Sequence, residues 1–132
     1  MQVPNMRTVM TASKQIVYLV DDDPRSLEVA ESILAGEDLD IRTFANARVA
    51  LDVFLATQHK PRLLVADYSM NEMNGFELIQ RCRAAAPDLR VVMVSGTLED
   101  DAAGKFPFKI DAFVAKPFRP EQLIHAVRQF VD

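Results

Sequence analysis

Acidic side chains follow two apolar runs of this chain, at the point where each run ends. Residues 63–66 (LLVA) precede Asp67, and residues 16–20 (IVYLV) precede the acidic triplet 21–23 (DDD). Each carboxyl group would be ionised at neutral pH, with an unperturbed pKa of about 3.9. Carboxylates that lie close together repel one another, and Mg²⁺ prefers such hard oxygen ligands while it keeps several waters. The spacing therefore indicates a cation site, provided that the ends of the two runs meet.

A hydroxyl and an ammonium follow two further apolar runs. Ser95 comes after residues 90–94 (RVVMV), and Lys116 comes after residues 112–115 (AFVA). An ionised Asp67 needs no general base to act as a nucleophile. Lys116 and Ser95 could contact the oxygens of an attacked phosphoryl group, and catalysis of phosphoryl transfer consists mostly of such positioning and charge stabilisation. These residue types indicate metal-assisted phosphoryl transfer to Asp67.

Alternating strand-like and helix-like segments would bring these residues together. Strand starts near residues 16, 40, 62, 90 and 111 lie 21 to 28 residues apart, which is enough for a helical crossover and too much for a hairpin. The alternation predicts an α/β fold of three layers, with helices on both faces of a parallel sheet. Right-handed crossovers favour the flavodoxin-like strand order 2-1-3-4-5, in which the first and third strands are neighbours. Asp21, Asp22 and Asp67 would then surround one crevice.

Turn and capping residues mark where the helices begin. Asp23 and Asn46 can accept the free amides of a first helical turn, and proline suits the first helical position at Pro24 and Pro120. The last helix carries an apolar stripe, which either packs on the sheet or serves as a partner surface. The expected strands are residues 16–20, 40–44, 63–67, 90–94 and 110–115, and the expected helices begin near residues 24, 47, 75, 98 and 120.

Composition is that of a globular domain, with 49% hydrophobic and 26% charged residues in 132. The net charge of −4 argues against a nucleic-acid-binding surface, and no apolar run approaches the ~20 residues of a membrane span. The single cysteine, Cys82, cannot form an internal disulfide and fits a reducing compartment. We therefore expect a cytoplasmic protein, with residues 1–14 as a leader and residues 15–132 as one domain.

The pattern resembles the receiver domain of two-component response regulators over about residues 15–132. The family's acidic pair after the first strand corresponds to Asp21 and Asp22, and its phosphoacceptor corresponds to Asp67. Its hydroxyl residue followed by a small residue corresponds to Ser95-Gly96, and its Lys-Pro pair, whose peptide bond is often cis, corresponds to Lys116-Pro117. Four motifs in the right order make the resemblance specific.

The resemblance implies a role for each residue of the crevice. Mg²⁺, or Mn²⁺ in its place, would bind Asp22, Asp67 and the backbone carbonyl of Ser69, with Asp21 helping through water. Ser95 and Phe113 would change position on phosphorylation and so alter the surface of the fourth helix, fifth strand and fifth helix. The groups expected to contact the phosphoryl group are the Tyr68 backbone amide, Ser95, Gly96 and Lys116.

The resemblance also implies partners. A histidine kinase or a histidine phosphotransfer protein would supply the phosphoryl group, and an effector protein or a fused output domain would receive the signal. Phosphorylation is further expected to promote a homodimer, whereas direct contacts with nucleic acid or membrane are not expected. The domain would assist its own phosphorylation and dephosphorylation without being an enzyme in the usual sense.

Several positions depart from the family pattern. Asn71 stands near the usual proline, Phe113 stands where many members have tyrosine, and the segment 104–108 is unusual. Ser69 and Thr97 occupy variable positions thought to tune dephosphorylation.

Three other functions fit parts of the pattern. A haloacid-dehalogenase-type phosphatase also uses an aspartate after a strand, but it needs a second aspartate where Ser69 stands. A flavodoxin-like FMN carrier would need a phosphate-binding loop where the acidic triplet lies. A receiver fold that serves as an interaction module without phosphorylation is the remaining alternative.

Overall fold

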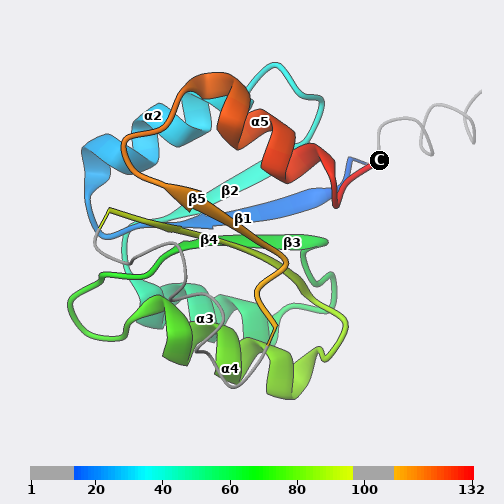
Figure 1. Cartoon of the computed structure of the whole chain (residues 1–132). Helices are drawn as coiled ribbons and strands as arrows, with labels where there is room; N and C mark the ends of the chain where they lie inside the picture. The colour runs from blue at the N-terminus through cyan, green and yellow to red at the C-terminus, as the bar shows by residue number, and fades with distance from the viewer. Residues whose placement is uncertain (1–13, 97–108) are drawn as a thin grey trace, which may run out of the picture.

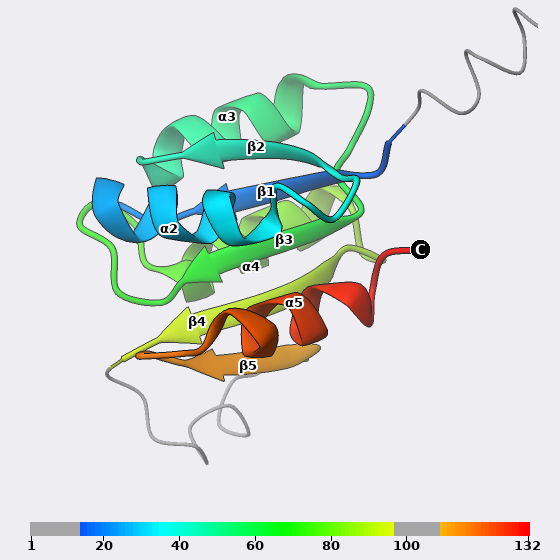
Figure 2. The ribbon, with the colours of Figure 1, turned by 90° about the horizontal axis from the view of Figure 1, so that it is seen from above.

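The computed structural model describes residues 14–96 and 109–132, and these form a five-stranded parallel sheet in the order β2-β1-β3-β4-β5 (Figures 1 and 2). The predicted flavodoxin-like order is confirmed. Figure 2 shows the arrowheads of the strands pointing toward the same edge of the sheet. The strands are β1 (Ile16–Val20), β2 (Asp40–Phe44), β3 (Leu63–Asp67), β4 (Arg90–Ser95) and β5 (Ala112–Ala115).

Helices cover both faces of this sheet, which gives the three predicted layers. Figure 1 shows α2 and α5 on one face and α3 and α4 on the other. Each face has its own apolar core: Leu27, Leu34 and Leu123 belong to the first, and Tyr18, Phe54 and Ile79 to the second. The helices are α2 (Pro24–Leu34), α3 (Ala47–Ala56), α4 (Gly75–Ala85) and α5 (Pro120–Arg128).

The helices start where the capping residues predict. The side-chain oxygens of Asp23, Asn46 and Asn74 accept the amides of Arg25, Val49 and Glu77 at 2.9–3.0 Å. Each bond satisfies one of the amides that the first turn of a helix leaves free.

Two boundaries differ from the sequence expectation. β4 extends one residue further, to Ser95, because the Ser95 carbonyl accepts the Lys116 amide at 3.0 Å. β5 begins at Ala112 rather than near residue 110, and Asp111 immediately before it contacts several cations. The helix expected near residue 98 lies outside the described residues, as do residues 1–13 of the expected leader.

The apolar stripe of α5 lies mainly against the sheet. Leu123, Val127 and Val131 are buried, and the partly buried Ile124 and Phe130 pack against the same core. Packing therefore accounts for the stripe that the sequence left open. Among the described residues, no helix has the length and apolar character that crossing a membrane requires.

Candidate functional site

The strand order brings the three acidic residues together at one edge of the sheet. β1 and β3 are hydrogen-bonded neighbours whose register pairs Val20 with Ala66, so the next residues, Asp21 and Asp67, lie side by side where the two strands end. One carboxylate oxygen from each of Asp21, Asp22 and Asp67 lies within 4.8 Å of the others. The predicted cluster is therefore present.

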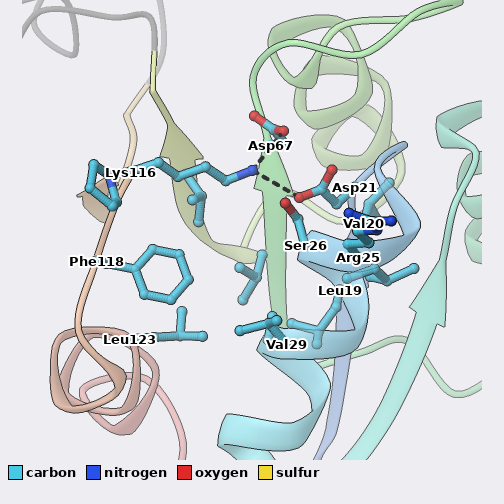
Figure 3. A pocket seen from close by; sticks show the side chains of 15 residues that line it. Leu19, Val20, Asp21, Arg25, Ser26, Val29, Asp67, Lys116, Phe118 and Leu123 are labelled. Atoms are coloured by element: carbon cyan, nitrogen blue, oxygen red, sulfur yellow. Dashed lines mark hydrogen bonds and ion pairs between the residues drawn. The ribbon is translucent and has the colours of Figure 1, made fainter.

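Lys116 reaches this cluster from the end of β5, across β4 (Figure 3). Its Nζ donates to Oδ2 of Asp21 at 3.0 Å and to Oδ2 of Asp67 at 3.1 Å. The Lys116–Pro117 peptide is cis, as the resemblance led us to expect. With three carboxylates and one ammonium, the cluster carries a formal charge of −2.

Burial and the neighbouring charges shift the pKa values of Asp67 and Lys116. Burial raises the pKa of the Asp67 carboxyl, and the nearby Asp21 charge raises it further, while the Lys116 ammonium only partly offsets both effects. Burial lowers the pKa of Lys116, but its hydrogen bonds to Asp21 and Asp67 outweigh that effect, and the net pKa lies above its ordinary value. Lys116 thus stays charged at neutral pH, and Asp67 is less stabilised as an anion than a free carboxylate.

The loop after β3 places one backbone amide on Asp67. The Ser69 amide donates to Asp67 Oδ1 at 3.2 Å, whereas the Tyr68 amide donates to the Val94 carbonyl at 2.9 Å. The amide that faces the carboxylate is therefore that of Ser69. The Tyr68 amide extends the pairing of β3 with β4. Its expected contact with a phosphoryl group stays a prediction.

Ser95 and Gly96 lie at the end of β4, opposite β1. Ser95 is fully buried, and its backbone carbonyl accepts the Lys116 amide. A Cβ at Gly96 would lie 3.4 Å from Lys116 Cβ, which is ordinary van der Waals contact. Phe113 is half-buried in β5, against the core under α3 and α4. The switching roles of Ser95 and Phe113 stay predictions.

Gly75 belongs to the site for a reason that the sequence reasoning missed. A Cβ at this position would lie 2.6 Å from the Asp67 carbonyl oxygen, closer than real Cβ contacts. The Gly75 amide donates to the Tyr68 carbonyl at 2.9 Å. Glycine thus lets the start of α4 lie directly against the backbone of Asp67. Only the folded structure reveals this close approach.

The chemistry of the donor set fits a hard divalent cation. Asp21, Asp22 and Asp67 offer carboxylate oxygens, which are the ligands that Mg²⁺ and Mn²⁺ prefer, and the excess negative charge favours such an ion. Asp22 has one further contact that the sequence reasoning did not foresee. Its Oδ2 accepts the Asn71 backbone amide at 2.9 Å, which ties the loop between β3 and α4 to the cluster.

A cavity of about 490 Å³ opens beside Asp67 and Lys116 (Figure 3). It lies between α2 and the segment from Pro117 to Leu123, and Val29 of α2 lines it while remaining 53% exposed. Its walls are mostly apolar side chains. The acidic cluster is thus accessible from a surface that could hold part of another molecule.

Comparison with known proteins gives a consistent result. The sequence model described as "Response regulator receiver domain" matches residues 17–128. An uncharacterized 14.6 kDa protein of Leptolyngbya boryana is 30% identical, and the match covers 92% of this chain and 94% of that protein. The DNA-binding response regulator MtrA of Mycolicibacterium smegmatis is 29% identical, over 90% of this chain and 51% of its own length. This chain thus spans about half of that longer relative.

Solved structures show the same fold. A CheY-like receiver domain protein of Methanospirillum hungatei superposes with a TM-score of 0.79 at 24% identity, over 89% of this chain and 93% of that one. The BeF3-activated receiver domain of DrrB gives a TM-score of 0.78 at 24% identity, over 89% and 97% of the two chains.

Proposed function

The chain belongs to the response regulator receiver domain family of two-component systems, and from this membership we propose that Asp67 accepts a phosphoryl group from a phosphohistidine. The donor is a histidine kinase or a histidine phosphotransfer protein. One observation carries the proposal: Lys116 bridges Asp21 and Asp67 at 3.0 and 3.1 Å, at the edge where the strands end. This arrangement supplies a nucleophile, a fixed cation and an acidic metal site in one place.

The chain's own groups have distinct tasks in this transfer. An Asp67 carboxylate oxygen attacks phosphorus, and the bond from phosphorus to the donor imidazole nitrogen breaks. Lys116 and the Ser69 amide, which contact the Asp67 carboxylate before the reaction, stabilise the negative charge of the transferred oxygens. Ser95 and Gly96 contact the same oxygens from the end of β4. Positioning and charge stabilisation supply most of the catalysis.

The metal site uses Asp22, Asp67 and the Ser69 carbonyl, with Asp21 assisting through water. Mg²⁺, with Mn²⁺ as a substitute, supplies positive charge that neutralises the phosphoryl oxygens and the remaining carboxylates. Asp21 and Lys116 keep each other in place through the 3.0 Å contact.

The switch follows from the change of charge at Asp67, from about −1 as a carboxylate to about −2 as an acyl phosphate. Ser95 donates to a new oxygen, and Phe113 occupies the space that Ser95 leaves. The surface around β5 and α5 then changes its preference for an effector protein, a fused output domain or a second copy of the chain. The setting is cytoplasmic, where two-component donors act.

The alternatives each have a feature against them. Ser69, which is exposed, offers no carboxylate where a haloacid-dehalogenase-type phosphatase needs one. A receiver fold that acts without phosphorylation has no need for the charge excess beside Lys116, because that excess destabilises the fold unless a cation binds.

The test is phosphorylation by a small donor. Incubation with Mg²⁺ and acetyl phosphate is expected to add one phosphoryl group to the wild type by intact-mass spectrometry, and none to Asp67→Asn. Asp52→Asn is the matched control, since this carboxylate lies on α3 with its side chain 66% exposed. Equal incorporation in Asp67→Asn would assign the reaction to another residue, and no incorporation in the wild type would favour the interaction module.

A further inference from the structure

The loop between β3 and α4 is tied to the acidic cluster by a backbone contact. The Asn71 N–H donates to Asp22 Oδ2 at 2.9 Å, across 49 positions of sequence. The next residue, Glu72, accepts the side-chain amide of Asn46 at 2.7 Å, and Met73 is buried. The loop is therefore anchored directly after Asn71, and the Asn71 amide is held toward Asp22.

The three carboxylates differ in what orients them. Asp21 and Asp67 share the Lys116 ammonium, and each also accepts a nearby backbone amide, from Asp23 and Ser69 respectively. Asp22 is half-buried, and among residues 14–96 and 109–132 its side chain accepts a hydrogen bond from the Asn71 amide alone. The contact with Asn71 therefore fixes which way the Asp22 carboxylate faces.

We propose that the Asn71 backbone N–H is a positioning group for the divalent cation: it holds Asp22 Oδ2 and leaves the other oxygen of Asp22 for the ion. A carboxylate can serve both partners because each oxygen carries its own lone pairs. Ligating carboxylates are commonly hydrogen-bonded in this way, and losing such a partner typically costs about 10–100-fold in metal affinity. This inference rests on the proposed function, since it concerns the same cation site.

The role belongs to the backbone and not to the asparagine side chain. Any residue with an N–H can make the contact, whereas proline cannot, because its ring nitrogen carries no hydrogen. Asn71→Ala and Asn71→Pro therefore form a matched pair. Both remove the side-chain amide, and only proline removes the donor to Asp22.

Isothermal titration with Mg²⁺ tests the proposal directly. We expect Asn71→Ala to bind Mg²⁺ within about twofold of the wild type and Asn71→Pro to bind about tenfold more weakly, at the lower end of the usual range because the loop is exposed. Thermal unfolding of all three proteins in EDTA is expected to differ little. Equal dissociation constants for the alanine and proline variants would overturn the positioning role.

A second measurement covers the case in which proline disturbs the loop by restricting Met70. Amide hydrogen exchange of the wild type, followed by NMR, is expected to show the Asn71 N–H protected both without Mg²⁺ and at saturating Mg²⁺. Loss of that protection on Mg²⁺ binding would show that the ion displaces the amide, and would overturn the proposal. A wild type that binds no Mg²⁺ would refute the cation site itself, and with it the proposed function, whereas the outcomes above concern Asn71 alone.

Discussion

A buried carboxylate lies at each end of the sheet, and the two have opposite charge surroundings. At the carboxyl ends of the strands, the Asp67 side chain is 10% exposed and shares a single ammonium with Asp21. At the opposite end, the Asp111 side chain is 3% exposed and lies 2.8 Å from Arg83, 3.3 Å from Arg90 and 3.8 Å from Lys109. Three carboxylates face one cation at one end, and one carboxylate faces three cations at the other.

The difference separates the proposed phosphoacceptor Asp67, at what we call the reactive end of the sheet, from Asp111 at the structural end. Asp111 also accepts the Val91 amide at 2.8 Å, so its oxygens are fully used in holding α4, β4 and the start of β5 together. Asp67 is also buried, and burial together with the nearby Asp21 charge raises the pKa of its carboxyl, which the single Lys116 ammonium only partly offsets. Burial alone does not mark a functional aspartate. A deficit of counter-charge distinguishes Asp67, for which we propose cation binding and attack on phosphorus.

Removing Asp111 is expected to have the largest effect on stability. Asp111→Asn removes the carboxylate charge that three cations share, and Arg83 is the least able of them to turn to water because its side chain is 17% exposed. We expect a loss of about 3 kcal/mol in the free energy of unfolding, near the lower end for broken buried ion pairs because Arg90 and Lys109 are largely solvated. Urea denaturation measures it, with Asp52→Asn as the exposed control. A loss below about 1 kcal/mol would contradict the structural role of Asp111.

Adding Mg²⁺ is expected to stabilise the protein through the other end of the sheet. A ligand that binds the folded state at a hundred times its dissociation constant contributes about 2.7 kcal/mol. The wild type should show this gain in urea denaturation, and Asp67→Asn should lose most of it. Asp111→Asn should be less stable than the wild type without Mg²⁺ but should be stabilised by Mg²⁺ to the same extent, because Asp111 and its cations take no part in binding the ion. A gain in Asp67→Asn equal to that of the wild type would place the ion elsewhere.

The sequence predicted the reactive end of the sheet better than the structural end. Asp21, Asp67 and Lys116 each follow an apolar run, and parallel strands must place such residues at one edge, so their meeting could be predicted. Asp111 precedes its strand, and Arg83 lies near the end of a helix, so no simple rule of strand order joins them. Their contact depends on how α4 packs across β4, which the sequence pattern does not specify.

Backbone contacts explain what else the sequence could not predict. The amide of Ser69 rather than of Tyr68 faces Asp67 because Tyr68 continues the hydrogen bonding of β3 to Val94. Gly75 must be small because α4 begins against the Asp67 carbonyl. Such contacts use backbone groups that every residue except proline carries, so residue type does not reveal them unless proline would remove the donor or a side chain would clash.

A smaller effect is expected on the pH dependence of the free energy of unfolding, through the Asp67 carboxyl. Because burial and the nearby Asp21 raise the pKa of Asp67, the folded protein holds that proton more tightly than the unfolded chain. The stability that Asp67 contributes is fully present below its unfolded pKa of about 3.9 and is lost as pH rises through the folded pKa. Asparagine does not titrate. Asp67→Asn is therefore expected to be more stable than the wild type at pH 7 in EDTA, by about 1 kcal/mol, which is within the usual range for a stabilising substitution.

The check on this prediction is a pair of denaturation series between pH 4 and pH 8. The advantage of Asp67→Asn should shrink toward pH 4, as the wild type becomes protonated. An advantage that is independent of pH would mean that shape or hydrogen bonding, and not charge, sets the difference.

The smallest effect is expected for one cation of the structural cluster. Lys109 lies 3.8 Å from Asp111 with its side chain 75% exposed, and Arg83 and Arg90 remain when it is removed. Lys109→Gln should therefore change the free energy of unfolding by no more than about 0.5 kcal/mol, as for other exposed ion pairs. Lys116→Gln makes the same change of charge at the reactive end, where Lys116 alone bridges Asp21 and Asp67 among the described residues. It should cost more than Lys109→Gln in EDTA, and Mg²⁺ should restore part of the loss. If Lys109→Gln and Lys116→Gln lowered the free energy of unfolding equally, the extra cations around Asp111 would not compensate for a lost lysine. The proposed difference between the two ends of the sheet would then be wrong.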